Sequence, residues 1–141
     1  MDNNKKKILV VEDDPSSMRL TNYILERKGY QVITASNGFE GLRKARSDKP
    51  DLIVLDIMLP GVDGYEICNR LREDSATARL PIMMLSAKAR EVDRDIGLKV
   101  GADEYLTKPA LPSEIASRIE DLLARENKRQ HSGDILHSTD T

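Results

Sequence analysis

Short apolar runs alternate along the chain with longer segments in which apolar residues recur every three or four positions. The short runs are rich in β-branched residues and several are apolar throughout, as expected for strands that helices cover on both faces. They predict five strands, at residues 8–11, 31–35, 52–55, 82–85 and 104–107. The longer segments predict helices after each strand, from Pro15 to a C-terminal cap at Gly29 and at residues 38–46, 65–73, 90–100 and 112–125.

Local signals support two of these helices. Asp14 followed by Pro15 is a helix start, with an acid at the N-cap and proline at the first helical position. Phe39, Leu42 and Ala45 recur at a spacing of three and predict the apolar face of the helix at 38–46. Strands that alternate with helices of this length specify right-handed crossovers and a parallel sheet, so the predicted fold class is α/β, a three-layer sandwich.

Polar residues stand where the predicted strands end: Asp13 and Asp14, then Asp56, Ser86 and Lys108. The carboxyl ends of parallel strands open onto one crevice, so residues far apart in sequence can converge there. Three carboxylates, a hydroxyl and an ammonium meeting at one place describe a site for Mg²⁺ and a phosphoryl group.

Composition narrows the choice of function. The 141 residues suit one domain of common size. Lys and Arg total 22 against 24 Asp and Glu, so no global basic bias favours direct binding to nucleic acid. A single cysteine, Cys68, excludes an internal disulfide framework and suits a reducing compartment. No apolar run is long enough for a signal peptide or a membrane span, so we expect a cytoplasmic protein without membrane contact.

The last part of the chain differs in composition. Residues 126–141 are polar and include only two neighbouring aliphatic residues, too few to offset an ordering cost of about 1 to 2 kcal/mol per residue. We therefore expect a folded domain over residues 1–125 and a disordered tail over 126–141, or the beginning of a linker there. His131 and His137 both lie in this tail, which excludes histidine-based zinc chemistry and Ser-His catalysis within the domain.

Four motifs now carry a resemblance to a known family: VVEDDP at 10–15, LIVLDIMLPGVDG at 52–64, MLSAK at 84–88 and GADEYLTKP at 101–109. In their order and spacing they closely resemble the receiver domain of two-component response regulators. The resemblance covers residues 6–125 and implies the flavodoxin-like (βα)5 fold of the chemotaxis receiver, with strand order 2-1-3-4-5. It implies a signalling domain, not an enzyme, that catalyses only its own phosphorylation and dephosphorylation.

The resemblance assigns the acidic residues. Asp56 is similar to the phosphoacceptor, since a carboxylate can attack phosphorus and form an aspartyl phosphate. Asp13 and Asp14 are similar to the acidic pair that holds Mg²⁺ together with Asp56, and the family pattern adds the backbone carbonyl of Met58 as a ligand. Glu12 is expected to be a solvated acid beside the site.

The resemblance also assigns the groups that sense the phosphoryl group. Lys108 is expected to pair with Asp56 and later with a phosphoryl oxygen, and its bond to Pro109 is expected to be cis. Ser86 resembles the switch hydroxyl that moves to hydrogen-bond the phosphoryl group. Tyr105 resembles the switch aromatic that then turns inward, which alters the surface of the fourth helix, fifth strand and fifth helix.

Chemistry alone leaves plainer interpretations open for these residues. Asp56 and Ser86 suit an ordinary strand end or helix cap, and Asp14 is a good N-cap for the helix at Pro15. Lys108 taken alone is a surface lysine, and Tyr105 a half-buried strand aromatic with a hydrated hydroxyl.

Two further expectations concern regulation. The segment after Lys88 resembles the output face of receivers from winged-helix regulators, so Arg94 with Glu114, and Asp103 with Arg118, are candidates to pair across a phosphorylation-dependent homodimer. A solvated charged surface is the alternative, because exposed pairs contribute little. Ala110, where many relatives have phenylalanine, removes apolar bulk near that face.

Met58 and Lys88 occupy the two positions that in the family flank the path of the hydrolytic water. A thioether cannot position water as an amide or an acid does, so we expect slow self-dephosphorylation relative to chemotaxis receivers.

Three functions follow. The first is a stand-alone receiver that takes phosphate from a histidine kinase or phosphotransfer protein and acts on a downstream effector. The second is the receiver part of a longer regulator with a DNA-binding or enzymatic output domain. The third is a Mg²⁺-dependent phosphatase with an aspartyl nucleophile, which commonly needs a second acid where this chain has Met58. The sequence does not identify the cognate kinase, since surface residues of the first helix such as Ser17 and Leu20 determine that choice by their detailed fit to the partner.

Overall fold

The structure, a computed structural model, describes residues 5–139 of the chain and the side chains of residues 5–126. Five strands are formed by the described residues: β1 Lys7–Val11, β2 Gln31–Ala35, β3 Leu52–Leu55, β4 Ile82–Ser86 and β5 Glu104–Thr107. Five helices accompany them: α1 Pro15–Arg27, α2 Gly38–Ser47, α3 Gly64–Glu73, α4 Glu91–Lys99 and α5 Pro112–Thr139. The predicted elements are therefore confirmed, with most boundaries within one residue.

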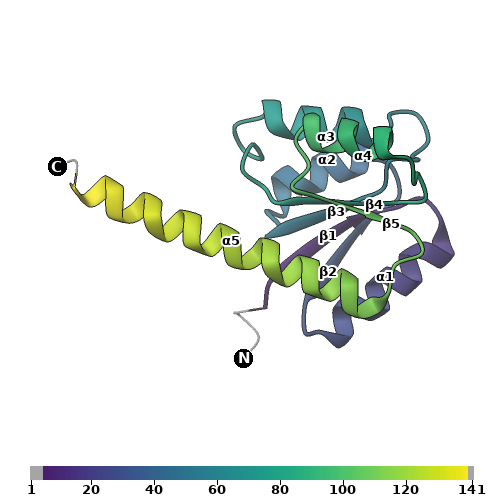
Figure 1. Ribbon diagram of the computed structural model, residues 1–141, viewed down its shortest axis with the longest axis horizontal. Helices are drawn as coiled ribbons and strands as arrows, with labels where there is room; N and C mark the ends of the chain where they lie inside the picture. Colours follow the sequence, from purple (N-terminus) through teal and green to yellow (C-terminus); the bar gives the residue numbers. More distant parts are fainter. Residues whose placement is uncertain (1–4, 140–141) are drawn as a thin grey trace.

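The strands form one parallel sheet in the order β2-β1-β3-β4-β5. Helices α2, α3 and α4 lie on one face of this sheet, and α1 and α5 lie on the other (Figure 1). The predicted α/β three-layer sandwich and its strand order are thus confirmed.

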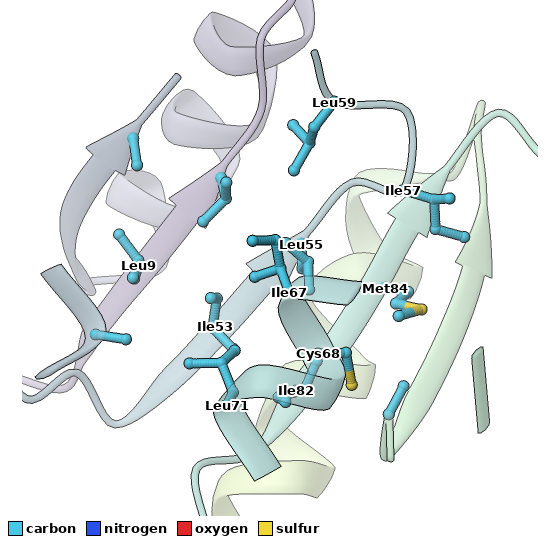
Figure 2. Packing of buried hydrophobic residues seen from close by; sticks show 14 of the residues in the cluster. Leu9, Ile53, Leu55, Ile57, Leu59, Ile67, Cys68, Leu71, Ile82 and Met84 are labelled. Carbon is cyan, nitrogen blue, oxygen red and sulfur yellow. The ribbon is translucent and has the colours of Figure 1, made fainter. Parts of the chain in front are cut away.

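Alternate residues of each strand enter two separate cores, because successive side chains point to opposite faces of a sheet. Leu9, Ile53 and Met84 belong to the core under α2 and α3, which Figure 2 shows around Ile67, Cys68 and Leu71. Their neighbours Ile8, Val54 and Met83 pack instead against α1 and α5. Both faces of the central strands are buried, so those strands are apolar throughout.

Asparagine or aspartate caps three helices that begin just beyond strand ends or their loops. Asp14, Asn37 and Asp63 each accept a hydrogen bond from the backbone N–H three residues later. Gly29 follows α1 with a φ of 93°, in agreement with the predicted C-terminal cap.

Helix α2 confirms two of the three residues of its predicted apolar face, since Ala45 is buried and Leu42 packs against the core, but Phe39 does not follow them. Phe39 is 59% exposed, and the guanidinium of Arg70 lies 5.8 Å from the centre of its ring. The buried residues of α2 are Gly38, Gly41 and Ala45. A Cβ at Gly41 would lie 2.8 Å from a methyl group of Val11, so this helix packs on the sheet through its glycines. Apolar spacing alone could not reveal that contact.

Helix α5 continues to Thr139, well past the end that the sequence analysis places at residue 125. Its far half extends away from the sheet (Figure 1). Residues 126–139 contain no proline, and extending an existing helix adds one hydrogen bond per residue without a new nucleation step. The helix thus differs from the disordered tail that the lack of apolar anchors predicts. The side chains of His131 and His137 lie outside the described residues, and the functional division at residue 125 stays a prediction.

Among residues 5–139, no helix has both the length and the apolar character that crossing a membrane requires.

Candidate functional site

Asp56 is a buried carboxylate directly after β3, with a residue exposure of 6%. Its backbone N–H donates to the carbonyl of Val11, which extends the pairing of β1 and β3 by one residue. Its Oδ1 accepts a hydrogen bond of 3.1 Å from the backbone N–H of Met58, and its Oδ2 lies 3.6 Å from Nζ of Lys108. Both oxygens are thereby held in defined directions at the carboxyl edge of the sheet.

Three carboxylates meet at this edge, and they are not the predicted three. Oxygen atoms of Glu12, Asp13 and Asp56 all lie within 4.8 Å of one another. Glu12 is only 5% exposed and forms an ion pair with Lys108, so the expectation of a solvated acid is wrong. Burial raises the pKa of Glu12, and the hydrogen bond with Lys108 opposes part of that shift.

Asp14 lies outside this group because its side chain is turned to α1. Its Oδ2 accepts a 2.8 Å hydrogen bond from the backbone N–H of Ser17, and that bond lowers the pKa of Asp14. The backbone N–H of Asp14 in turn donates to Glu12 at 3.1 Å. The acidic pair of the site is therefore Glu12 and Asp13, one position earlier than predicted. The dipeptide of Asp14 and Pro15 was the signal that could have shown this.

Lys108 reaches the acids from the end of β5. Its backbone N–H donates to the carbonyl of Ser86 at 2.8 Å, which fixes the two strand ends side by side. The bond between Lys108 and Pro109 is cis, as predicted. The ammonium lies between Glu12 and Asp56 and offsets part of their charge.

Ser86 and Tyr105 are connected through one residue of the loop after β4. Ser86 is fully buried, and its Oγ accepts a 3.4 Å hydrogen bond from the backbone N–H of Lys88. The hydroxyl of Tyr105 donates to the carbonyl of the same Lys88 at 2.7 Å. Tyr105 is 5% exposed, in the inward orientation, and burial raises its pKa to about 12.

Met58 projects its side chain to solvent with an exposure of 55%, next to the acidic group. The family role of its carbonyl as a ligand stays a prediction. A cavity of about 160 Å³ lies between α1 and the loop after β5, and its lining includes Lys108, Ser17, Leu20 and Ala110.

Three of the four predicted dimer residues have partners within the chain. Asp103 accepts a hydrogen bond of 2.9 Å from the guanidinium of Arg72, and Arg118 lies 2.8 Å from Glu104 and 3.9 Å from Glu114. Arg94 is exposed on α4. An intermolecular pair of Asp103 with Arg118 would have to compete with these contacts.

Comparison with known proteins shows which family this site belongs to. Residues 8–120 match the family model of the response regulator receiver domain. The chain belongs to this receiver domain family. It is 53% identical over 120 residues to the alkaline phosphatase synthesis transcriptional regulatory protein PhoP of Bacillus subtilis. The matched region covers 85% of this chain and 49% of PhoP. The chain therefore spans about half the length of the curated relatives it matches.

Solved receiver structures share the fold. A CheY-like receiver domain from Methanospirillum hungatei has a TM-score of 0.82 and 30% identity, and the match covers 89% of this chain and 99% of that one. The receiver domain of a sensor histidine kinase from Pseudomonas aeruginosa, solved with magnesium in its active-site cleft, has a TM-score of 0.80 and 31% identity over 85% and 98% of the two chains. Receiver domains of response regulators are signalling modules of two-component phosphorelays, and that is the function of this chain.

Proposed function

We propose that Asp56 is the residue that accepts the phosphoryl group, from a phosphohistidine of a histidine kinase or phosphotransfer protein. The supporting observation is a buried carboxylate held between a backbone N–H and the ammonium of Lys108, at 3.1 and 3.6 Å. The Asp56 oxygen forms the new bond to phosphorus as the bond from phosphorus to nitrogen breaks, and the electron pair returns to the imidazole. Lys108 offsets charge on the phosphoryl oxygens during transfer.

The acidic group fits Mg²⁺, which prefers carboxylate and carbonyl oxygens as ligands. Glu12, Asp13 and Asp56 would hold the ion, with the carbonyl of Met58 as a further ligand. The bound cation supplies positive charge that relieves repulsion among the carboxylates and favours phosphoryl transfer. The magnesium in the Pseudomonas receiver supports this assignment.

Ser86 and Tyr105 change position in response to phosphorylation of Asp56. The fully buried Ser86 hydroxyl lies at the end of β4, and Lys88 connects it by backbone hydrogen bonds to Tyr105. A dianionic group on Asp56 recruits the hydroxyl of Ser86, and the inward orientation of Tyr105 is favoured as a result. The output is a changed surface over α4, β5 and α5, and the only chemistry that the domain catalyses is its own phosphorylation and dephosphorylation.

The output domain is proposed from the relatives. Transcriptional regulators such as PhoP match this chain over only about half of their own length, which favours the receiver part of a DNA-binding regulator over a stand-alone receiver. A phosphatase with an aspartyl nucleophile is disfavoured by the family match and by Met58 at the position where a second acid is commonly needed. A cytoplasmic location stays a prediction from the sequence.

Small phosphodonors test the acceptor directly. With acetyl phosphate and Mg²⁺, intact-mass spectrometry should detect one phosphoryl group on the chain that base and hydroxylamine remove, and none on Asp56→Asn. Asp63→Asn is the matched control, because Asp63 caps α3 and asparagine caps a helix equally well. Undiminished labelling of Asp56→Asn would refute the assignment.

A dimer through Arg94 and Glu114 is the second proposal for the output face. Arg94 is exposed on α4, and the ion pair of Glu114 with Arg118 is long, at 3.9 Å. Sedimentation with and without beryllofluoride should show dimers only with it. A monomer under both conditions would contradict the dimer.

A slow loss of the phosphoryl group is proposed from Met58, whose exposed thioether cannot orient an attacking water. The decay of the phosphoprotein, followed by mass, should be slower than in Met58→Asn. Equal rates would contradict this role.

A further inference from the structure

Two tyrosine hydroxyls hold the beginning of α4. Tyr65, in the first turn of α3, donates a 3.0 Å hydrogen bond to the carbonyl of Asp93. Tyr105, on β5, donates a 2.7 Å hydrogen bond to the carbonyl of Lys88. These two carbonyls lie on either side of Arg90, the N-cap of α4. The loop before α4 is therefore tied to β5, and the first turn of α4 is tied to α3.

The same turn is closed by its own ion pair. Asp93 is 2% exposed, and its carboxylate accepts hydrogen bonds from the backbone and the guanidinium of Arg90. One turn further along, Gly97 lies against the ring of Tyr105, where an added Cβ would stand 2.9 Å from Cδ2. The position of α4 thus depends on where the two rings and their hydroxyls stand.

Tyr65 is linked to the phosphoacceptor through its neighbour in sequence. Gly64 begins α3 so close to the preceding loop that an added Cβ would collide with the carbonyl oxygen of Asp56 and stand 2.6 Å from Cα of Ile57. The backbone N–H of Gly64 also donates to the carbonyl of Ile57 at 2.9 Å. A displacement of the backbone at Asp56 therefore reaches the first turn of α3, which carries Tyr65.

We propose that Tyr65 is a positioning residue that couples Asp56 to the first turn of α4, alongside the route through Ser86, Lys88 and Tyr105. This inference rests on the proposed function of Asp56. Phosphorylation acts on α4 from two sides: from β4 and β5 through Tyr105, and from α3 through the hydrogen bond of Tyr65 to Asp93. Energetic coupling between two sites is carried by packed side chains and hydrogen bonds that have two discrete arrangements, and the contacts of Tyr65 and Gly64 form such a connection from Asp56 to α4.

The coupling is measured with beryllofluoride and Mg²⁺ as the phosphoryl analogue. Tyr65→Phe keeps the ring and removes one hydroxyl, and with it the hydrogen bond to Asp93 and the contact with the hydroxyl of Tyr105. Tyr23→Phe is the matched control, since Tyr23 is 61% exposed on α1, on the opposite face of the sheet from α4. Calorimetry of the whole chain should give an affinity for the analogue about 2- to 10-fold weaker in Tyr65→Phe, the range expected for one hydrogen bond, and unchanged in Tyr23→Phe.

A double-mutant cycle separates coupling from a purely structural role. Tyr65→Phe and Tyr105→Phe should be non-additive in the affinity for the analogue, because the two hydroxyls interact with each other and bind carbonyls on either side of Arg90. The amide resonances of Asp93 and Arg94 should also shift less on addition of the analogue in Tyr65→Phe than in the unchanged chain. Tyr65→Leu, which keeps an apolar side chain, should show the same loss and serves as the second variant.

The outcomes distinguish the two proposals. If the unchanged chain does not bind the analogue, the proposed function of Asp56 fails. If the unchanged chain and Tyr23→Phe bind it and Tyr65→Phe binds it with equal affinity, the role of Tyr65 is overturned. A lowered free energy of unfolding in Tyr65→Phe with an unchanged affinity also overturns it, since a structural hydrogen bond would act equally with and without the analogue.

Discussion

Replacing Asp56 by asparagine should make the domain more stable while abolishing its phosphorylation. Asp56 is nearly fully buried beside two other carboxylates, an arrangement that favours metal binding and costs folding free energy. The amide keeps the shape of the side chain and can still accept the hydrogen bond from the backbone of Met58. The substitution therefore removes a charge with little change in packing.

The geometry sets the magnitude of this gain. At 4.8 Å, two carboxylates repel each other by about 3.5 kcal/mol with an effective dielectric constant of about 20. The ammonium of Lys108 at 3.6 Å attracts Asp56 by about 4.6 kcal/mol on the same scale. Attraction and repulsion nearly cancel, since Glu12 repels Asp56 fully and the exposed Asp13 more weakly. What remains is the desolvation of an ionised carboxylate, several kcal/mol in a protein, of which we expect about 1 to 3 kcal/mol to appear as added stability.

Urea unfolding at neutral pH in the presence of a chelator measures this difference. Asp56→Asn should unfold at a higher urea concentration than the unchanged chain, and Asp63→Asn should unfold at the same concentration as the unchanged chain. Saturating Mg²⁺ should reduce the difference in unfolding urea concentration between Asp56→Asn and the unchanged chain, because the ion stabilises the protein with the intact acidic group more than the variant. If Asp56→Asn is equally or less stable in the chelator, the argument from charge burial is refuted.

Two further predictions follow from single contacts. Gly97→Ala should lower the free energy of unfolding by about 1 to 3 kcal/mol, although alanine favours helices. The reason is that the added Cβ would stand 2.8 Å from Sδ of Met84 and 2.9 Å from the ring of Tyr105. A variant that is more stable in urea would contradict this packing. Burial holds the pKa of Glu12 above its unfolded value, so its contribution to stability is present at acid pH and is lost as the pH rises from about 4 through the folded pKa. Across that pH range the free energy of unfolding should decline less steeply with pH in Glu12→Gln than in the unchanged chain. Parallel curves for Glu12→Gln and the unchanged chain would argue against a raised pKa of Glu12.

The acidic site shows where prediction from the sequence was accurate and where it was not. The positions of Asp56, Ser86 and Lys108 at the carboxyl edge of the sheet are confirmed because each directly follows or ends a short strand. Parallel strands bring such positions to one edge whatever the details of packing. The choice between Glu12 and Asp14 was wrong because neighbouring acids carry the same sequence signal, and only the direction of each side chain separates them.

The surface of the domain was predicted less well than its sheet. Phe39 fits the apolar stripe of Leu42 and Ala45 but lies exposed, since Gly41 lets the adjacent side of α2 approach Val11. Asp103 was considered for a partner subunit, yet Arg72 holds it within the chain across 31 positions of sequence. Neither contact leaves a local pattern that a reader of the sequence could recognise.

The sequence by itself determined the α/β class, the strands and the capped helix starts, because hydrophobic period and capping preference act over a few neighbouring residues. It also determined that acids, a serine and a lysine would meet at one edge of the sheet. Only the tertiary structure decided that Glu12 faces the site while Asp14 caps α1, and that Tyr65 reaches Asp93 across 28 positions of sequence. These facts depend on the distances and directions between side chains that folding brings together, which no local pattern encodes.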